Sequence, residues 1–114
     1  MTSGLSIIVE KKGPVAILRI EGRMDAASSP VLEVQLTNLI QQNFKNFLLD
    51  FSKVEYLSSA GMRLLLSMTK KLKASGSKLF FCSINDEVME IIRMASFEKI
   101  LSIYKTEKEA LESI

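Results

Sequence analysis

The chain has 114 residues, a net charge of +2, 47% hydrophobic residues and 25% charged residues, which is the balance of one soluble globular domain. The absence of histidine excludes Ser-His-Asp and Cys-His catalysis, and the single cysteine, Cys82, can form neither an internal disulfide nor most zinc sites. The small charge, and the lack of an apolar run of about 18 residues, argue against nucleic acid or a membrane as the main partner. We therefore expect a single domain over residues 1–114, cytoplasmic and non-enzymatic, without a cofactor or a metal.

Two β-rich runs open the chain. Residues 5–10 (LSIIVE) and 14–21 (PVAILRIE) flank a short polar turn, a pattern that predicts an antiparallel hairpin. The loop that follows, EGRMDAASSP, ends at Pro30, which suits the first position of a helix, with Ser29 as its N-cap. Apolar residues at helical spacing then predict a helix over residues 30–43.

The second half of the chain alternates strands and helices. A short apolar run over residues 47–51 predicts a central strand, and a helix is expected from near Ala60 to residue 74, with Gly76 as its stop signal. The sequence KLFFCS at 78–83 predicts another buried strand. The last predicted elements are a helix capped by Asn85, a short edge strand over residues 100–104, and a helix opened by the capping-box pair Thr106 and Glu109 that reaches about Ile114.

The predicted order is β-β-α-β-α-β-α-β-α, which places the chain in the α/β class. Helices that separate the later strands favour parallel pairing there, whereas the opening hairpin is antiparallel. The prediction is a mixed sheet of four to five strands with about four helices packed against it.

Two adjacent hydroxyl residues, Ser58 and Ser59, lie where the central strand gives way to a helix. A serine at a helix N-terminus commonly caps first-turn amides, and Gly61 is explained if the backbone passes close to a neighbouring element. A cap needs only one hydroxyl, however, and α/β sheets place functional loops after the carboxyl ends of their strands. The free amides of the helix would also tolerate a phosphate. Capping and modification are both open, and Ser59 can serve both.

The stretch DFSKVEYLSSAGMRLLL (residues 50–66) resembles the signature of the STAS family, specifically the bacterial anti-sigma factor antagonists. In that signature an Asp-Phe/Leu-Ser segment and a hydrophobic spacer lead to a serine-glycine turn that opens a helix. LRIEGRMDAASSPVLE (residues 18–33) is similar to the strand–Gly-x-x-Asp–helix entry of the family. The resemblance covers nearly the whole chain and implies the STAS fold.

The resemblance also implies partner switching. In such antagonists an anti-sigma factor with serine kinase activity phosphorylates the serine two residues before the glycine, which is Ser59 here, with Ser58 as the less favoured alternative. The unphosphorylated protein binds the anti-sigma factor and releases a sigma factor, and a serine phosphatase reverses the modification; ATP belongs to the kinase. This chain has Ser58 where many relatives have aspartate, and Ala60 where some have a second hydroxyl.

The same resemblance implies a partner-binding face. It comprises Asp25, Ser58, Ser59, Gly61 and Met62, with the 22–29 loop beside the first turn of the helix. Asp25 equally suits a turn or cap, and Met62 suits a core position. The simpler interpretations cover the remaining polar residues: Asp50 and Ser52 shape a strand exit, Cys82 is an inert buried thiol, and Arg63, Lys70, Lys71 and Lys73 form a solvated helix face.

Two other functions stay open. One is a STAS scaffold that is never phosphorylated, or a regulatory subunit of a signalling or transport complex. The other is a small enzyme that uses Asp25, Asp50 or Glu55, against which the missing histidine and the absence of cofactor motifs both argue.

Overall fold

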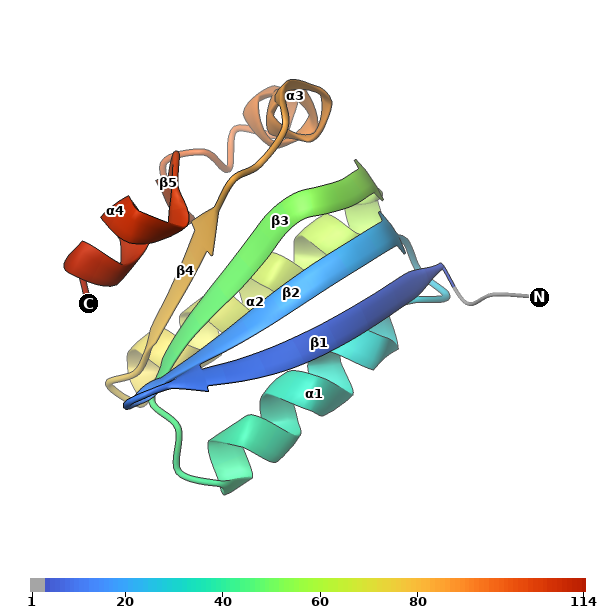
Figure 1. Ribbon diagram of the computed structural model, residues 1–114. Helices are drawn as coiled ribbons and strands as arrows, with labels where there is room; N and C mark the ends of the chain where they lie inside the picture. The colour runs from blue at the N-terminus through green and yellow to red at the C-terminus, as the bar shows by residue number, and fades with distance from the viewer. Residues whose placement is uncertain (1–3) are drawn as a thin grey trace.

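The computed structural model describes residues 4–114, which form five strands and four helices in the predicted order (Figure 1). The chain starts with the hairpin and alternates helices and strands after it, as the sequence predicted. The elements are β1 (Leu5–Lys12), β2 (Val15–Met24), α1 (Ser29–Gln41), β3 (Asn46–Leu57), α2 (Ser59–Ala74), β4 (Lys78–Cys82), α3 (Asp86–Met94), β5 (Ser102–Tyr104) and α4 (Glu107–Glu112).

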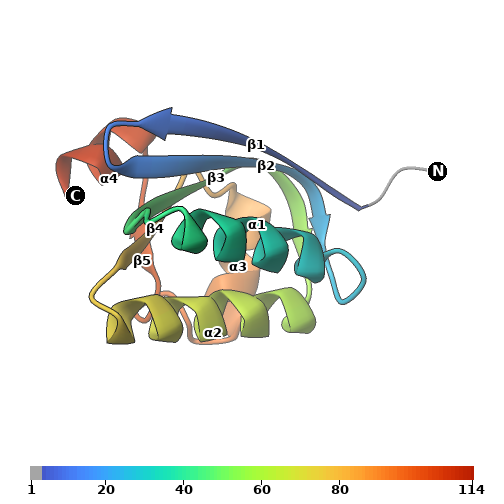
Figure 2. The ribbon, with the colours of Figure 1, turned by 90° about the horizontal axis from the view of Figure 1, so that it is seen from below.

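The strands form one sheet in the order β1-β2-β3-β4-β5. β1 pairs with β2 in antiparallel fashion, and every later pair is parallel, as expected when a helix separates consecutive strands. Helices α1, α2 and α3 lie on one face of the sheet, whereas α4 lies on the other (Figure 2). Much of the face that carries α4 is left open by the helices.

Alternation along the central strands divides the core into two clusters. Ala16, Leu18 and Ile20 of β2 face the large cluster beneath α1–α3, whereas Val15 and Ile17 face a smaller cluster beneath α4. All five are at most 6% exposed. Both faces of β2 are therefore buried at this end of the strand, which explains its continuous apolar run.

Several boundaries differ from the sequence prediction, and two of them have a clear physical cause. α1 ends at Gln41 instead of residue 43, because Asn43 adopts a left-handed conformation (φ 71°) that a helix cannot continue through. β3 runs on to Leu57 instead of ending near residue 51. The added part of β3 is still paired with β2, but the pairing contains two register shifts. These shifts interrupt the regular alternation of buried and exposed side chains, so the sequence SKVEYL does not show the pattern of a strand.

The predicted N-cap of α1 is also wrong. Ser28, not Ser29, precedes the helix, and its side chain makes no capping hydrogen bond. The Ser29 hydroxyl instead donates to the carbonyl oxygen of Asp25 at 2.6 Å, from inside the first turn. Both serines are buried and tie the loop before α1 together.

β2 and β3 end at the same side of the molecule, and α1 and α2 both begin there (Figure 2). The last residues of these strands, Met24 and Leu57, are paired in register. The 22–29 loop and the start of α2 therefore lie side by side, although they are 30 positions apart in the chain.

Candidate functional site

The serine corner, residues 58–61, joins β3 to α2. Ser58 is the N-cap of α2: its hydroxyl oxygen accepts a hydrogen bond from the amide of Gly61 at 3.1 Å. Its own amide donates to the carbonyl oxygen of Met24 at 2.9 Å and so ties the corner to the end of β2. The capping role that the sequence allowed for Ser59 belongs to Ser58.

Ser59 is the first residue of α2 and is exposed. Within residues 4–114 its hydroxyl makes no hydrogen bond, so it can be modified without breaking a bond that holds the fold. It also lies at the positive end of the helix dipole, where added negative charge is tolerated. The two serines are adjacent in sequence, but only the Ser58 hydroxyl makes a hydrogen bond that stabilises the fold.

Gly61 is required by close packing. A Cβ atom at this position would lie 2.8 Å from the carbonyl oxygen of Met24 and 2.9 Å from Cδ1 of Leu57. The next residue, Met62, is only 3% exposed and packs in the main core. The structure therefore corrects the expectation that Met62 contacts a partner directly, because its side chain faces the sheet.

Asp25 shapes the neighbouring loop. Its Oδ1 accepts hydrogen bonds from the amides of Ala27 at 3.1 Å and Ser28 at 3.0 Å, the pattern of an aspartate turn. The Ser28 hydroxyl lies 3.1 Å from the same oxygen and 2.6 Å from the carbonyl oxygen of Arg23. The bond from the Ser28 amide is the main cause that lowers the pKa of Asp25. Asp25 is thus an ionised turn residue beside the serine corner.

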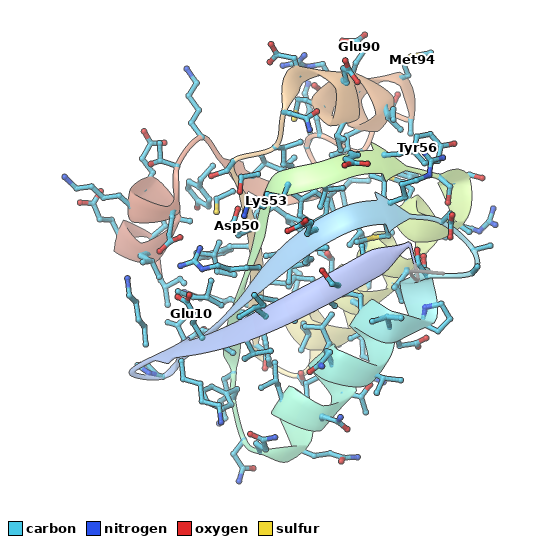
Figure 3. The ribbon with its side chains drawn as sticks, turned by 45° about the vertical axis from the view of Figure 1, so that its right-hand side comes forward. Glu10, Asp50, Lys53, Tyr56, Glu90 and Met94 are labelled. Carbon is cyan, nitrogen blue, oxygen red and sulfur yellow. The ribbon has the colours of Figure 1, made fainter. Side chains whose placement is uncertain are left out.

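A pair that sequence reasoning missed flanks the corner. The guanidinium of Arg23 lies over the Tyr56 ring, 4.4 Å from its centroid, and the two residues are paired across β2 and β3. Tyr56 is 36% exposed and is labelled near the end of β3 in Figure 3. Strand alternation could not reveal this pair, because a register shift directly precedes it.

On the face of the sheet that carries α4, Arg19 forms hydrogen bonds with three carboxylates. It donates to both oxygens of Glu10 at 2.9 and 2.8 Å, to Asp50 at 2.9 Å, and to Glu107 at 2.7 Å. Figure 3 labels Glu10 and Asp50 on this face. Asp50 also accepts from the amide of Ser52 at 2.9 Å, but both residues lie within β3, which runs on to Leu57, so the prediction that they shape a strand exit is wrong.

These carboxyl groups are poorly suited to general acid–base catalysis. The bond from Arg19 is the main cause that lowers the pKa of Glu107, and it does the same for Glu10. Burial pushes the pKa of Asp50 upward, but hydrogen bonds from Ser52 and Arg19 outweigh burial and leave the pKa lowered. A general base works best with a pKa near the working pH. We therefore assign the network a structural role, which is to hold β1, β2, β3 and α4 together. Among residues 4–114, no cluster of three or more acidic or cysteine side chains is placed to hold a metal.

The thiol of Cys82 is fully buried, and burial raises its pKa, which fits the inert role predicted for it. Across the described part of the chain, no helix combines the length and the apolar character needed to cross a membrane.

Comparison with known proteins accounts for this arrangement. The family model of the STAS domain matches residues 6–110. The chain belongs to the STAS domain family. An anti-sigma F factor antagonist of Paenibacillus polymyxa is 26% identical over 111 residues, which cover 96% of this chain and 95% of that protein.

Solved structures of anti-sigma factor antagonists share the fold. An anti-sigma factor antagonist from Mycobacterium paratuberculosis superposes with a TM-score of 0.86 at 22% identity, covering 96% of this chain and 93% of that one. The antagonist SpoIIAA matches in its unphosphorylated form (TM-score 0.78, 16% identity, 95% of each chain). It also matches in its phosphorylated form (TM-score 0.70, 15% identity, 95% of this chain and 98% of that one). The relatives are binding proteins, in agreement with the non-enzymatic role expected from the sequence.

Proposed function

We propose that this STAS domain is an anti-sigma factor antagonist that is switched by phosphorylation of Ser59. In the unphosphorylated state it binds an anti-sigma factor with serine kinase activity and so frees a sigma factor; phosphorylation ends this binding, and a serine phosphatase restores it. The observation that carries the proposal is that the two serines of the serine corner have different roles. Ser58 caps α2, whereas Ser59 is exposed and its hydroxyl is unused by the fold.

The docking face consists of the serine corner together with the 22–29 loop. Ser58 and Gly61 hold the start of α2 against the carbonyl oxygen of Met24, so the loop that begins at Asp25 has a fixed position relative to Ser59. We assign Gly61 and Met62 to positioning, and Asp25 to the rim of the face. The relatives support this role, because the antagonist SpoIIAA is known in both phosphorylation states.

Phosphorylation acts on binding and leaves the fold intact. A phosphate adds about −1.5 to −2 charges and three acceptor oxygens at the point of contact. The same charge lies at the N-terminus of α2, where the dipole and the first-turn amides stabilise it in the free protein. The complex therefore loses affinity while the domain keeps its stability.

Release of a sigma factor from its complex with the anti-sigma factor tests the proposal. The anti-sigma factors of the source organism are purified with their sigma factors, and release is followed as the antagonist is added. Wild type and Ser59→Ala should release the sigma factor, whereas Ser59→Asp should release it poorly. Ser6→Asp adds the same charge at an exposed position of β1 and should behave as wild type.

Two results would contradict the proposal. Failure of the wild-type protein to release any of the sigma factors would remove the antagonist role. Equal release by Ser59→Asp and wild type, with no phosphate taken up from ATP, would instead favour a STAS scaffold that binds without a switch.

A further inference from the structure

One face of α2 carries cations in line with Ser59. Arg63, Leu66, Lys70 and Lys73 follow Ser59 at intervals of 4, 3, 4 and 3 residues, which is the spacing of one helical stripe. The three cations are exposed and Leu66 is half-buried. We call Arg63, Lys70 and Lys73 the basic stripe; it spans about 15 Å at 1.5 Å per residue.

The basic stripe has no internal counter-charge. Helix α2 contains no acidic residue, and within residues 4–114 none of the three cations forms an ion pair. Within residues 4–114, the cations paired with carboxylates are Lys12, Arg19, Lys53 and Arg93; others, such as Lys45 and Lys99, are not, so the stripe is distinguished by its alignment with Ser59 and not by the lack of ion pairs alone. The stripe alone carries +3 in a protein whose net charge is +2.

Helix stability explains only part of this pattern. Lys73 lies in the last turn of α2, where a cation interacts favourably with the helix dipole. Arg63 lies in the second turn, toward the positive end of the helix, and gains nothing from the dipole. Its position, four residues after Ser59, calls for another explanation.

The adjoining helix offers no partner either. Residues 26–44, which include α1, contain a single charged residue, Glu33, although a quarter of the whole chain is charged. On the side of α2 that faces α1, few charged residues are therefore available to offset the positive charge of the basic stripe. Neither α2 nor the segment 26–44 therefore places a carboxylate in an ion pair with the stripe.

We infer that the basic stripe docks an acidic surface of the anti-sigma factor, and that phosphorylation works by weakening this attraction; the inference rests on the proposed function. A phosphate on Ser59 reduces the charge of the stripe and Ser59 together from +3 to about +1. The phosphate also lies at the i,i+4 spacing from Arg63, so it competes with the partner's carboxylates for that guanidinium.

A protein partner fits better than nucleic acid or a membrane. The stripe holds three cations on one helix and includes no aromatic side chain on which a base could stack. The rest of the chain supplies no further excess of positive charge, because the protein carries 15 basic and 13 acidic residues in all. Stable attachment to anionic lipid or to phosphodiester usually needs a larger basic patch.

Association kinetics with the anti-sigma factor identified by the release assay test the inference. The stripe variant combines Arg63→Glu, Lys70→Glu and Lys73→Glu. The control variant combines Lys11→Glu, Lys105→Glu and Lys108→Glu, which changes the net charge equally at exposed sites outside α2. At about 50 mM salt, the stripe variant should associate at least roughly tenfold more slowly than wild type, and the control variant within about twofold. High salt should reduce the difference.

Several outcomes would overturn the inference. Equal slowing of both variants would mean that only net charge matters, and unchanged rates in the stripe variant would remove the stripe from the interface while leaving the proposed function intact. Binding of wild type to a 20-base-pair DNA duplex or to phosphatidylserine vesicles, lost in the stripe variant, would assign the stripe to those ligands. If no anti-sigma factor binds wild type, the proposed function and this inference fall together. Should the stripe variant fail to fold by circular dichroism, glutamine replaces glutamate at the three positions of both the stripe variant and the control variant, and only the stripe variant should then associate more slowly than wild type.

Discussion

Replacing Gly61 by alanine tests the close approach that holds the serine corner against β2. Two opposing effects are involved. Alanine is favoured over glycine by about 1 kcal/mol inside a helix. The new Cβ, however, would lie 2.8 Å from the carbonyl oxygen of Met24, 2.9 Å from Cδ1 of Leu57 and 3.0 Å from Cγ of Met24. The first of these is a backbone atom that accepts a hydrogen bond from the Ser58 amide, so it cannot move away freely.

Overpacking of this kind typically costs about 1–3 kcal/mol. Since the clash involves backbone as well as side chain, we expect it to outweigh the helix propensity and to lower the free energy of unfolding by about 1–2 kcal/mol. Urea denaturation followed by circular dichroism measures the change. Ser67→Ala, at an exposed position of the same helix, is the control and should be neutral or slightly stabilising. A Gly61→Ala variant as stable as wild type, or more stable, would refute the close approach.

Two further predictions concern stability. Ser58→Ala removes the N-cap of α2 and should lower the free energy of unfolding by about 1 kcal/mol, whereas Ser59→Ala should change it by less than about 0.5 kcal/mol; thermal or urea melts that rank the two serines in the opposite order would contradict the assignment of the cap. The lowered pKa values of Asp50 and Glu107 predict that stability depends on pH. The two ionised carboxylates stabilise the folded state fully above their pKa values in the unfolded chain, about 4, and this stabilisation is lost as the pH falls through their lower pKa values in the folded state. Urea midpoints measured between pH 6 and pH 2.5 should fall less steeply in Glu107→Gln than in wild type, and parallel curves would show that Arg19 does not stabilise the ionised Glu107 in the folded state.

Local patterns predicted most of the fold. Asn85 and Thr106 cap their helices as expected, accepting from the amides of Val88 at 2.9 Å and Glu109 at 3.1 Å. These assignments hold because a cap depends on residues within one turn of it. The order of elements and the parallel pairing were also correct, since both follow from hydrophobic periodicity and the rules for connections.

The errors have a different origin. Sequence alone could not decide between adjacent hydroxyls, because Ser58 and Ser59, like Ser28 and Ser29, are equivalent by residue type. Ser58 has the extended backbone of an N-cap, whereas Ser59 is already helical. Tertiary contacts set that difference, chiefly the hydrogen bond between Ser58 and the end of β2.

The Arg19 network escaped prediction for a related reason. Its carboxylates come from positions 9, 31 and 88 residues away in the chain, and only the folded sheet brings them together. The burial of Met62 is a milder case. Helical spacing allowed either an inner or an exposed position for a first-turn residue, and the approach of α2 to β2 at Gly61 turns it inward.

Phosphosite mapping tests the central claim most directly. The wild-type protein is incubated with ATP and the anti-sigma kinase identified by the release assay, and the modified residue is located by tandem mass spectrometry, with Ser58→Ala and Ser59→Ala treated in parallel. The account predicts a single phosphate on Ser59, retained in Ser58→Ala and absent from Ser59→Ala. A phosphate on Ser58, or full incorporation into Ser59→Ala, would contradict it.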